Sequence, residues 1–299
     1  MKYVFGPVSS RRFGVSLGID LSPDKKRCNF DCVYCELEPS KVVDVYDLPP
    51  SVDDIVDEVK DAIKRYDFDV LTITSNGEPT LYPYLDELIN KLRLLDKKLL
   101  ILSNASTIYE KKIQESLKQL DIVKLSLDSV IERHFKKIDR PSKKVSLDNI
   151  IKGIISFRKI FTNQLIIEVL VVKGINDTKE DFITLNEILK KINPDRVDIS
   201  TIDRPPAYNV KAVDIKKLFE LSSYIDNQNI FIPTRENLIY KKEFLSEDDI
   251  LNTLKKRPFS IFDVENLLSS ESKNLFDKLY KEGKIKAKNI SGIIFYGVN

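Results

Sequence analysis

The chain has 299 residues, and its 48 basic and 46 acidic side chains give a formal charge of +2. This length suits about two domains, and 42% hydrophobic with 31% charged residues excludes a disordered chain, a collagen-like repeat and a disulfide-dense secreted scaffold. No apolar run reaches the roughly 18 to 20 residues of a membrane helix, and the first residues lack the apolar core of a signal peptide. We therefore expect a cytoplasmic protein with no membrane partner.

Strands and helices alternate along the chain up to about residue 240. Expected strands cover 17–21, 70–74, 99–102, 122–127, 165–172 and 196–200, and expected helices cover 52–66, 81–95, 108–120, a stretch ending near 160, 179–191 and 213–226. This alternation predicts an α/β fold with a parallel sheet wrapped by helices. Neither a G-x-G-x-x-G after the first strand nor a G-x-x-x-x-G-K-[ST] is present. The pattern favours a partial (β/α)6 TIM-like barrel over residues 1–240.

The pattern changes after about Ile239. A capped helix begins near Ser246, a second short helix follows Pro258, a third covers 270–282, and 285–298 reads as a β-hairpin. This order predicts a winged-helix domain over 245–299, a fold that often places its third helix in a nucleic-acid groove. Basic residues occupy that helix and the hairpin, with acidic residues between them: Lys273, Lys278, Lys281, Lys284, Lys286 and Lys288 against Glu271, Asp277 and Glu282. Nucleic-acid binding and a protein-docking or lid role both remain open.

All three cysteines lie within one short segment, at Cys28, Cys32 and Cys35. An odd number leaves one unpaired, and a disulfide between residues this close would constrain only a tiny loop. Metal binding is the better interpretation. Three thiolates leave one position open in a zinc site or in a four-iron cube. Zinc would need His134, the only histidine, as its fourth ligand, although the charged residues around His134 are typical of a solvated helix.

Polar residues follow each predicted strand, where barrels of this type carry their chemistry. Each segment alone has a simpler explanation, because Ser, Asn, Gly and Pro also make caps and turns. Their occurrence at every strand end, beside a metal-binding loop, favours a functional site. The segments after the cysteine loop are 75–80, 103–106, 126–129, 173–177 and 203–206.

The C-x3-C-x2-C segment, with Tyr34 before the third cysteine, and the later Gly77-Glu78-Pro79 resemble the radical S-adenosylmethionine (SAM) superfamily over residues 3–235. Within it, residues 5–12 and 77–83 resemble the group containing the wyosine-forming tRNA synthases. Residues 126–129 and 173–177 are also similar to the enzyme that begins molybdopterin synthesis. Those enzymes use further cysteines for a second cluster, and this chain has none after Cys35. The resemblance therefore implies a single-cluster relative.

The resemblance implies a role for each matching residue. Cys28, Cys32 and Cys35 would hold three irons of a [4Fe-4S] cluster, and SAM would chelate the fourth iron. Glu78 would face the methionyl ammonium, and Asn76 stands where the family has the first glycine of its G-G-E-P element. The full set of implied SAM-binding residues is Tyr34, Gly77, Glu78, Asn104, Ser126 and Asp128.

The implied reaction begins when a reduced cluster passes an electron to SAM, and the resulting 5′-deoxyadenosyl radical abstracts hydrogen from a substrate. The electron would come from a flavodoxin or ferredoxin. Arg204 and Lys173 are the catalytic candidates on the rim, and Arg11, Arg12 and Asp203 are further candidate substrate contacts, although each could instead form a rim salt bridge.

Three functions fit these observations. The first is a radical SAM enzyme acting on RNA, with tRNA foremost, and the second is the same chemistry on a protein or peptide. The third is a redox-sensing iron-sulfur regulator of DNA, which would not need the Gly77-Glu78-Pro79 element or a full barrel.

Overall fold

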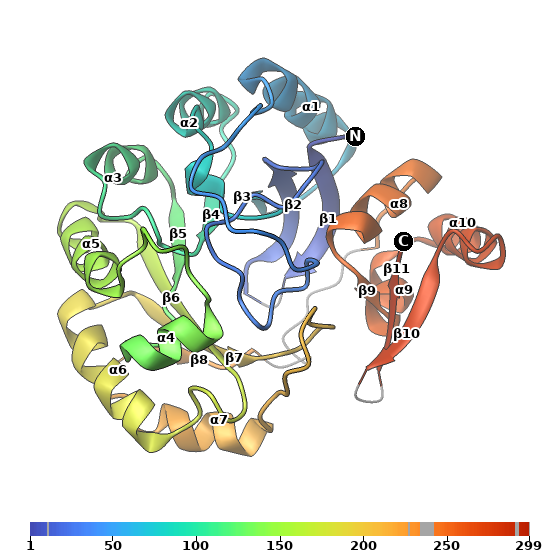
Figure 1. Ribbon diagram of the computed structural model, residues 1–299. Helices are drawn as coiled ribbons and strands as arrows, with labels where there is room; N and C mark the ends of the chain where they lie inside the picture. The colour runs from blue at the N-terminus through green and yellow to red at the C-terminus, as the bar shows by residue number, and fades with distance from the viewer. Residues whose placement is uncertain (11, 227, 234–241, 291–292, 299) are drawn as a thin grey trace.

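The computed structural model describes residues 1–299 except 11, 227, 234–241, 291–292 and 299 (Figure 1). A sheet of eight strands in the order β1 to β8 curves into a partial barrel, with helices around its outside. β1 pairs with β2 in antiparallel fashion, and the pairs from β2 to β8 are parallel. The predicted α/β fold with a parallel sheet is confirmed. Its strands are β1 Val4–Ser10, β2 Gly14–Asp20, β3 Val70–Thr74, β4 Leu99–Ser103, β5 Ile122–Ser126, β6 Gln164–Val171, β7 Arg196–Thr201 and β8 Ile230–Phe231.

The outer helices pack one apolar face against the sheet. In α1, Val52, Ile55, Val56 and Val59 are buried, which is the three- and four-residue spacing of one helix face. These residues join a single large core with the outward side chains of the strands. The helices of this layer are α1 Val52–Arg65, α2 Leu85–Arg93, α3 Lys111–Leu117, α5 Leu147–Ile160, α6 Lys179–Ile192 and α7 Ile215–Ser222. The short helix α4 Glu132–Ile138 lies instead over the opening of the barrel, inside the ring of outer helices (Figure 1).

The opposite, concave face of the sheet carries two layers. Val70, Leu100, Ile122 and Ile166 form a separate apolar cluster with Phe13 against them. Two residues further along their strands, and therefore on the same face, lie Lys124 and Glu168, joined by a 2.6 Å ion pair. The candidate substrate contact Arg12 lies in this charged layer, 2.8 Å from Glu168 and 3.0 Å from Asp198. Arg12 therefore makes ion pairs inside the barrel, whereas the sequence had left open a substrate contact or a salt bridge on the rim.

Several predicted boundaries were wrong. The helix expected over 81–95 begins only at Leu85, after a 3-10 turn at Pro79–Leu81, because Tyr82 precedes Pro83 and takes an extended conformation. The helix expected over 108–120 is shortened to α3, and the helix expected over 213–226 is shortened to α7, which begins at an Asp214 cap. The antiparallel strand β1 and the short strand β8 were not predicted.

The last part of the chain forms a second, smaller sheet. Its elements are α8 Glu247–Lys256, β9 Phe259–Ser260, α9 Ile261–Leu267, α10 Ser270–Lys281, β10 Lys286–Ile290 and β11 Ile293–Gly297. The strands lie in the order β10, β11, β9, and α8 packs beside β1 (Figure 1). The predicted helices and hairpin are present, although the centre of the hairpin at Gly292 lies outside the described residues. No helix in the described part of the chain is long and apolar enough to cross a bilayer.

Candidate cofactor site

The cysteine loop follows β2 and is held by the segment after α4. The amide of Asp31 donates to Asp139 O (3.1 Å), that of Val33 to Ile138 O (2.8 Å), and that of Ser142 to Asn29 O (2.8 Å). Phe30 also packs edge-on against Phe135 of α4, with ring centroids 5.7 Å apart. The backbone of the loop is therefore fixed by the protein itself.

The three cysteines are half-buried. Cys28 Sγ lies 3.4 Å from the amide of Phe30 and 3.7 Å from Asn104 Nδ2, and Cys32 Sγ lies 3.4 Å from Asp139 Oδ1. Burial raises the pKa of all three thiols, to about 12 for Cys28. Because thiolates are the metal-binding form, a metal must displace these protons when it binds.

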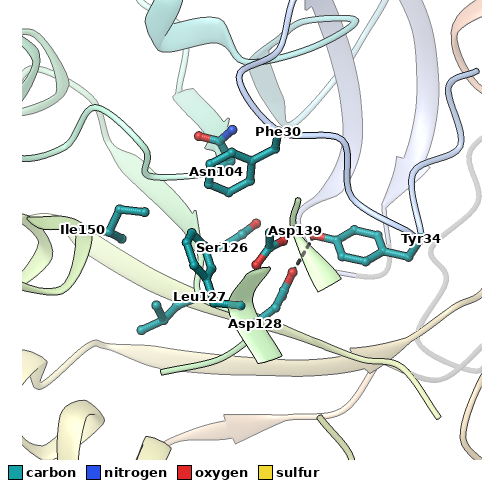
Figure 2. Close-up of a pocket in the computed structure, with 9 residues that line it drawn as sticks. Phe30, Tyr34, Asn104, Ser126, Leu127, Asp128, Asp139 and Ile150 are labelled. Atoms are coloured by element: carbon teal, nitrogen blue, oxygen red, sulfur yellow. Dashed lines mark hydrogen bonds between the residues drawn. The ribbon is translucent and has the colours of Figure 1, made fainter. Parts of the chain in front are cut away.

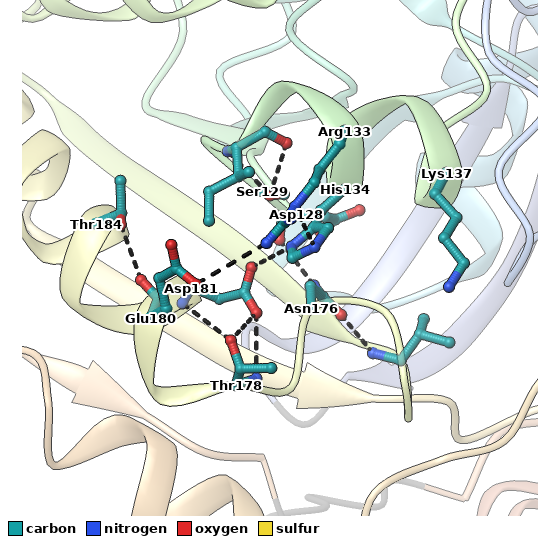
Figure 3. Close-up of polar contacts among 12 residues, drawn as sticks. Asp128, Ser129, Arg133, His134, Lys137, Asn176, Thr178, Glu180, Asp181 and Thr184 are labelled. Atoms are coloured by element: carbon teal, nitrogen blue, oxygen red, sulfur yellow. Dashed lines mark hydrogen bonds and ion pairs between the residues drawn. The ribbon is translucent and has the colours of Figure 1, made fainter.

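The donor set suits a cluster better than a single zinc ion. Among the described residues, no three His, Cys, Asp or Glu side chains are placed to share one metal ion. His134 is already engaged through both ring nitrogens, since Nδ1 lies 2.5 Å from Asp181 Oδ1 and Nε2 accepts from Arg133 Nε at 3.1 Å (Figure 3). The zinc alternative with His134 as fourth ligand is not formed. Thiols spread along one loop match a cube, in which each binds a different iron.

The loop after β3 is tied to the cysteine loop at Gly77. The amide of Arg27 donates to Asn76 O and the amide of Glu78 donates to Arg27 O, each at 2.8 Å. Gly77 has a φ of +146°, and a Cβ there would lie 1.7 Å from Arg27 O. Only glycine fits this crossing. The two sequence motifs thus meet directly, one residue before Cys28.

Glu78 is buried and anchors the loop after β4. Its Oε1 accepts hydrogen bonds from Thr80 N (2.9 Å), Thr80 Oγ1 (2.6 Å) and Ser103 Oγ (2.7 Å), and Oε2 accepts from Asn104 N (2.6 Å). Burial raises the pKa of Glu78, while these hydrogen bonds oppose that shift. The carboxylate therefore joins two strand-end loops, whatever else it contacts. The hydroxyl of neighbouring Ser75 is buried without a hydrogen-bond partner in the described structure, which is consistent with a ligand that completes the site.

A pocket lies between the cysteine loop and the ends of β4 and β5 (Figure 2). Tyr34 donates from its hydroxyl to Asp128 Oδ2 at 2.5 Å. Asp128 also shares a hydrogen bond with Asp139, and burial raises the pKa of Asp128 to about 6 and that of Asp139 well above its usual range. Four predicted SAM-binding residues line this pocket, together with residues that the sequence did not single out: Tyr34, Asn104, Ser126 and Asp128, with Phe30, Leu127, Phe135, Asp139 and Ile150.

Asp128 is held from below by Asn176, in the loop after β6 (Figure 3). Asn176 Nδ2 donates to Asp128 O at 2.7 Å and to Leu170 O at 2.9 Å, and its Oδ1 accepts from Val172 N at 2.8 Å. The amide of Leu170 donates to Asp128 Oδ1 at 2.8 Å. Asn176 therefore positions Asp128 for the pocket.

The two catalytic candidates occupy different surroundings. Arg204 forms a 3.1 Å ion pair with Glu36, next to Cys35, and the amide of Ala207 donates to Cys35 O at 2.8 Å. The loop after β7 therefore rests on the cysteine loop. Lys173 is exposed and is not among the pocket residues. Asp203 interacts with another part of the protein and is not a free carboxylate. Arg11 lies outside the described residues.

The chain matches the radical SAM superfamily over residues 24–186, a range that contains the three cysteines and all the residues that line the pocket. The protein belongs to this superfamily. It is a radical SAM enzyme, whose cofactors are a [4Fe-4S] cluster and SAM.

Two relatives match this chain over nearly its full length, and a third matches about half of it. It is 40% identical to a UPF0026 protein of Helicobacter pylori over 298 residues, 98% of this chain and 96% of that one. It is 32% identical to a UPF0026 protein of Methanocaldococcus jannaschii, covering 100% of this chain and 97% of that one. A GTP 3′,8-cyclase of Helicobacter pylori is 34% identical over 51% of this chain and 46% of its own length.

Among solved structures, Streptococcus suis SuiB bound to S-adenosylmethionine gives a TM-score of 0.56 at 20% identity, over 80% of this chain. SuiB bound to the precursor peptide SuiA gives 0.60 at 20% identity, over 85% of this chain. The chain spans about half the length of SuiB, 53% and 55% in these two structures. At this identity the likeness shows the fold alone.

Proposed function

We propose that the protein cleaves SAM reductively and abstracts hydrogen from an RNA substrate, with tRNA as the foremost class. Cys28, Cys32 and Cys35 are the proposed cluster ligands. When bound, the cluster and SAM supply a 5′-deoxyadenosyl radical. The main observation that supports this site is the close backbone contact between Gly77 and Arg27. This contact joins the loop that bears the cysteines to the loop that would face SAM.

The remaining residues of the proposed site bind, orient and shield. The backbone of the loop at Asn76 and Gly77 would receive the methionyl group, and Tyr34 and Asp128 would contact the adenosine portion. Phe30 and Phe135 border the same pocket with apolar rings. Such a border keeps water away from a reactive intermediate. Arg204, through its position beside Cys35, and Lys173 on the rim are proposed substrate contacts.

The choice of RNA rests on the last part of the chain. We propose a barrel domain over 1–240 and a winged-helix domain over 245–299. Lys281, Lys286 and Lys288 are exposed, and none of them forms an ion pair with another described residue. Lys286 and Lys288 alternate along β10 and share one face. Exposed lysines of this kind suit contacts with phosphate groups. Because the net charge of the chain is near zero, we propose that RNA binds through these lysines rather than through the overall electrostatic field.

Binding of total tRNA, measured at several salt concentrations, tests this choice. The double variant Lys286→Glu/Lys288→Glu should bind tRNA more weakly and show a slope of log affinity against log salt reduced by about 1 to 2. The matched control is Lys60→Glu/Lys64→Glu, which changes exposed lysines of α1. The RNA proposal fails if the Lys286→Glu/Lys288→Glu variant binds tRNA as well as the Lys60→Glu/Lys64→Glu control does. It also fails if tRNA does not increase formation of 5′-deoxyadenosine.

A protein or peptide substrate is the second candidate, favoured by the likeness to SuiB, which was solved with its precursor peptide. A peptide substrate would increase 5′-deoxyadenosine formation in the absence of RNA and would leave the Lys286→Glu/Lys288→Glu variant as active as the parent. The regulator hypothesis is not retained, because the chain is an enzyme of the radical SAM superfamily. A flavodoxin or ferredoxin, in the cytoplasm, is the proposed electron donor.

A further inference from the structure

Helix α8 is attached to the outer edge of the barrel at β1. Asn252 Nδ2 donates to Val4 O at 2.8 Å, and Thr253 Oγ1 accepts from Gly6 N at 3.1 Å. Arg257, directly after the helix, donates to Ser9 O at 3.2 Å. β1 is the first strand of the sheet, so its outer backbone groups have no strand partner among the described residues. Side chains of α8 take the place of that missing strand.

Lys256 leaves the same helix and reaches the end of β2. Its Nζ lies 2.6 Å from Lys2 O and 3.6 Å from Asp20 Oδ2. The side chains of Lys256 and Asp20 are only 5% and 2% exposed. Asp20 Oδ2 is buried and accepts no hydrogen bond within the described structure. A buried carboxylate of this kind requires a nearby positive charge, and Lys256 supplies it.

The other oxygen of Asp20 connects the two loops of the cofactor site. Asp20 Oδ1 accepts from Ser22 N at 2.9 Å and from Asn76 N at 2.8 Å. Ser22 stands at the start of the cysteine loop. Asn76 belongs to the loop that pairs with Arg27, the residue before Cys28. The Asp20 carboxylate therefore holds both loops at once, in addition to the backbone hydrogen bonds of Arg27.

We infer that Lys256 is a positioning residue for the cofactor site: the C-terminal region supplies the charge that holds Asp20, and Asp20 holds the loops at Ser22 and Asn76. The cofactor site is therefore built partly by residues outside the barrel. The inference that Lys256 positions the two loops follows from these contacts alone. The expectation that Lys256 also affects SAM affinity rests on the proposed function.

Hydrogen exchange of the full-length protein, read by mass spectrometry, tests the inference. In Lys256→Met, amides of residues 20–28 and 74–80 should exchange about ten times faster than in the parent, and Lys256→Arg should restore slow exchange. Lys255→Met is the matched control, because Lys255 is the exposed neighbour on α8. It should leave both segments unchanged.

A charge-neutral partner variant separates positioning from general loss of stability. Asp20→Asn keeps the acceptor oxygen and removes the buried charge, so adding Lys256→Met to Asp20→Asn should change exchange of the two segments by less than twofold. The inference is overturned if Lys256→Met speeds exchange only at the contact between α8 and β1, or if the double variant exchanges as fast as Lys256→Met.

Binding of SAM, measured by calorimetry on the same variants, tests the consequence for the cofactor. A tenfold weaker affinity in Lys256→Met, restored in Lys256→Arg, supports the whole account. Faster exchange with unchanged SAM affinity would support the positioning role and contradict the proposed placement of SAM. Unchanged exchange with weaker SAM binding would contradict the positioning role and leave the proposed site intact.

Discussion

At the residue scale, Gly77 allows the loop after β3 to pair with the backbone of Arg27, beside the cysteines. A Cβ at this position would overlap Arg27 O, and the φ of +146° is strained for any other residue. We expect Gly77→Ala to lower the free energy of unfolding by about 1 to 3 kcal/mol and to abolish detectable SAM cleavage. Chemical denaturation and assay of 5′-deoxyadenosine measure the two effects.

The control for this substitution is Gly297→Ala, whose added Cβ would meet nothing within 4 Å. It should behave as the parent does in both measurements. Normal SAM cleavage by Gly77→Ala would show that the crossing at Arg27 is not required.

Glu78 gives a second prediction at this scale. In Glu78→Gln, one carboxylate oxygen becomes an amide NH2, which must face a donor, either Asn104 N or the group formed by Thr80 and Ser103. Two buried donors that face each other without an acceptor cost about 1 to 3 kcal/mol. We expect the free energy of unfolding, measured in urea, to fall by that amount in Glu78→Gln. Glu115→Gln, at an exposed position on α3, should change stability by less than about 0.5 kcal/mol.

The sequence identified residues whose role depends on local chemistry. Gly77 and Asn104 stand in turns shortly after strands, and the cysteines are grouped in the loop that follows β2, so their positions along the chain mark them. Asp139 and Asp20 were missed because their roles arise from contacts that the chain makes at long range. Asp139 meets Cys32 across a separation of 107 residues, and no periodicity or motif near Asp139 indicates that meeting.

At the element scale, the short helix α4 supports the cysteine loop from one end and is fastened to α6 at the other. His134 on α4 binds Asp181, which also forms the capping box of α6 with Thr178 (Figure 3). Both ring nitrogens of His134 are therefore engaged within the protein, by Asp181 and by Arg133. This histidine therefore has a structural role.

We expect His134→Ala to lower the free energy of unfolding by about 1 to 2 kcal/mol, because the part-buried hydrogen bond to Asp181 and the packing of the ring are lost. The iron content after anaerobic reconstitution should equal that of the parent. Cys35→Ser serves as the positive control and should bind less iron. A loss of bound metal in His134→Ala would instead favour the zinc site.

Element boundaries followed the sequence where side-chain periodicity and caps agreed. α6 begins at its Thr178 cap and covers nearly the expected residues, because its capping box and apolar spacing define it locally. The sequence did not predict β1, because glycine and proline interrupt its apolar pattern. Its pairing with β2 also includes a register shift between Phe5 and Val8. Its place in the sheet depends on β2 and α8, which local patterns do not reveal.

At the scale of the whole molecule, the C-terminal region and the barrel share buried contacts through α8. Thr253 is buried and accepts the hydrogen bond of Gly6 N. We expect Thr253→Val, which keeps the shape and removes the acceptor, to lower the free energy of unfolding by about 1 to 3 kcal/mol. The unfolding transition measured by far-ultraviolet circular dichroism and the hydrogen exchange of the β1 amides should both change in this variant. We expect this because the barrel and the C-terminal region unfold in a single step.

Thr184→Val is the control, because Thr184 is exposed and bonds only to its own helix. Separate transitions for the barrel and for residues 245–299 in Thr253→Val would contradict this coupling. The sequence predicted the order of elements in both regions, but the attachment of α8 to β1 required the folded chain.

The central claim is that this barrel binds a [4Fe-4S] cluster through Cys28, Cys32 and Cys35 and uses it to cleave SAM. Electron paramagnetic resonance of the anaerobically reconstituted and reduced protein, with and without SAM, tests it most directly when the same samples are assayed for 5′-deoxyadenosine. We predict a [4Fe-4S] signal that changes when SAM is added, together with 5′-deoxyadenosine that is absent in Cys32→Ala. A protein that takes up zinc, shows no cluster signal and forms no 5′-deoxyadenosine would contradict the account.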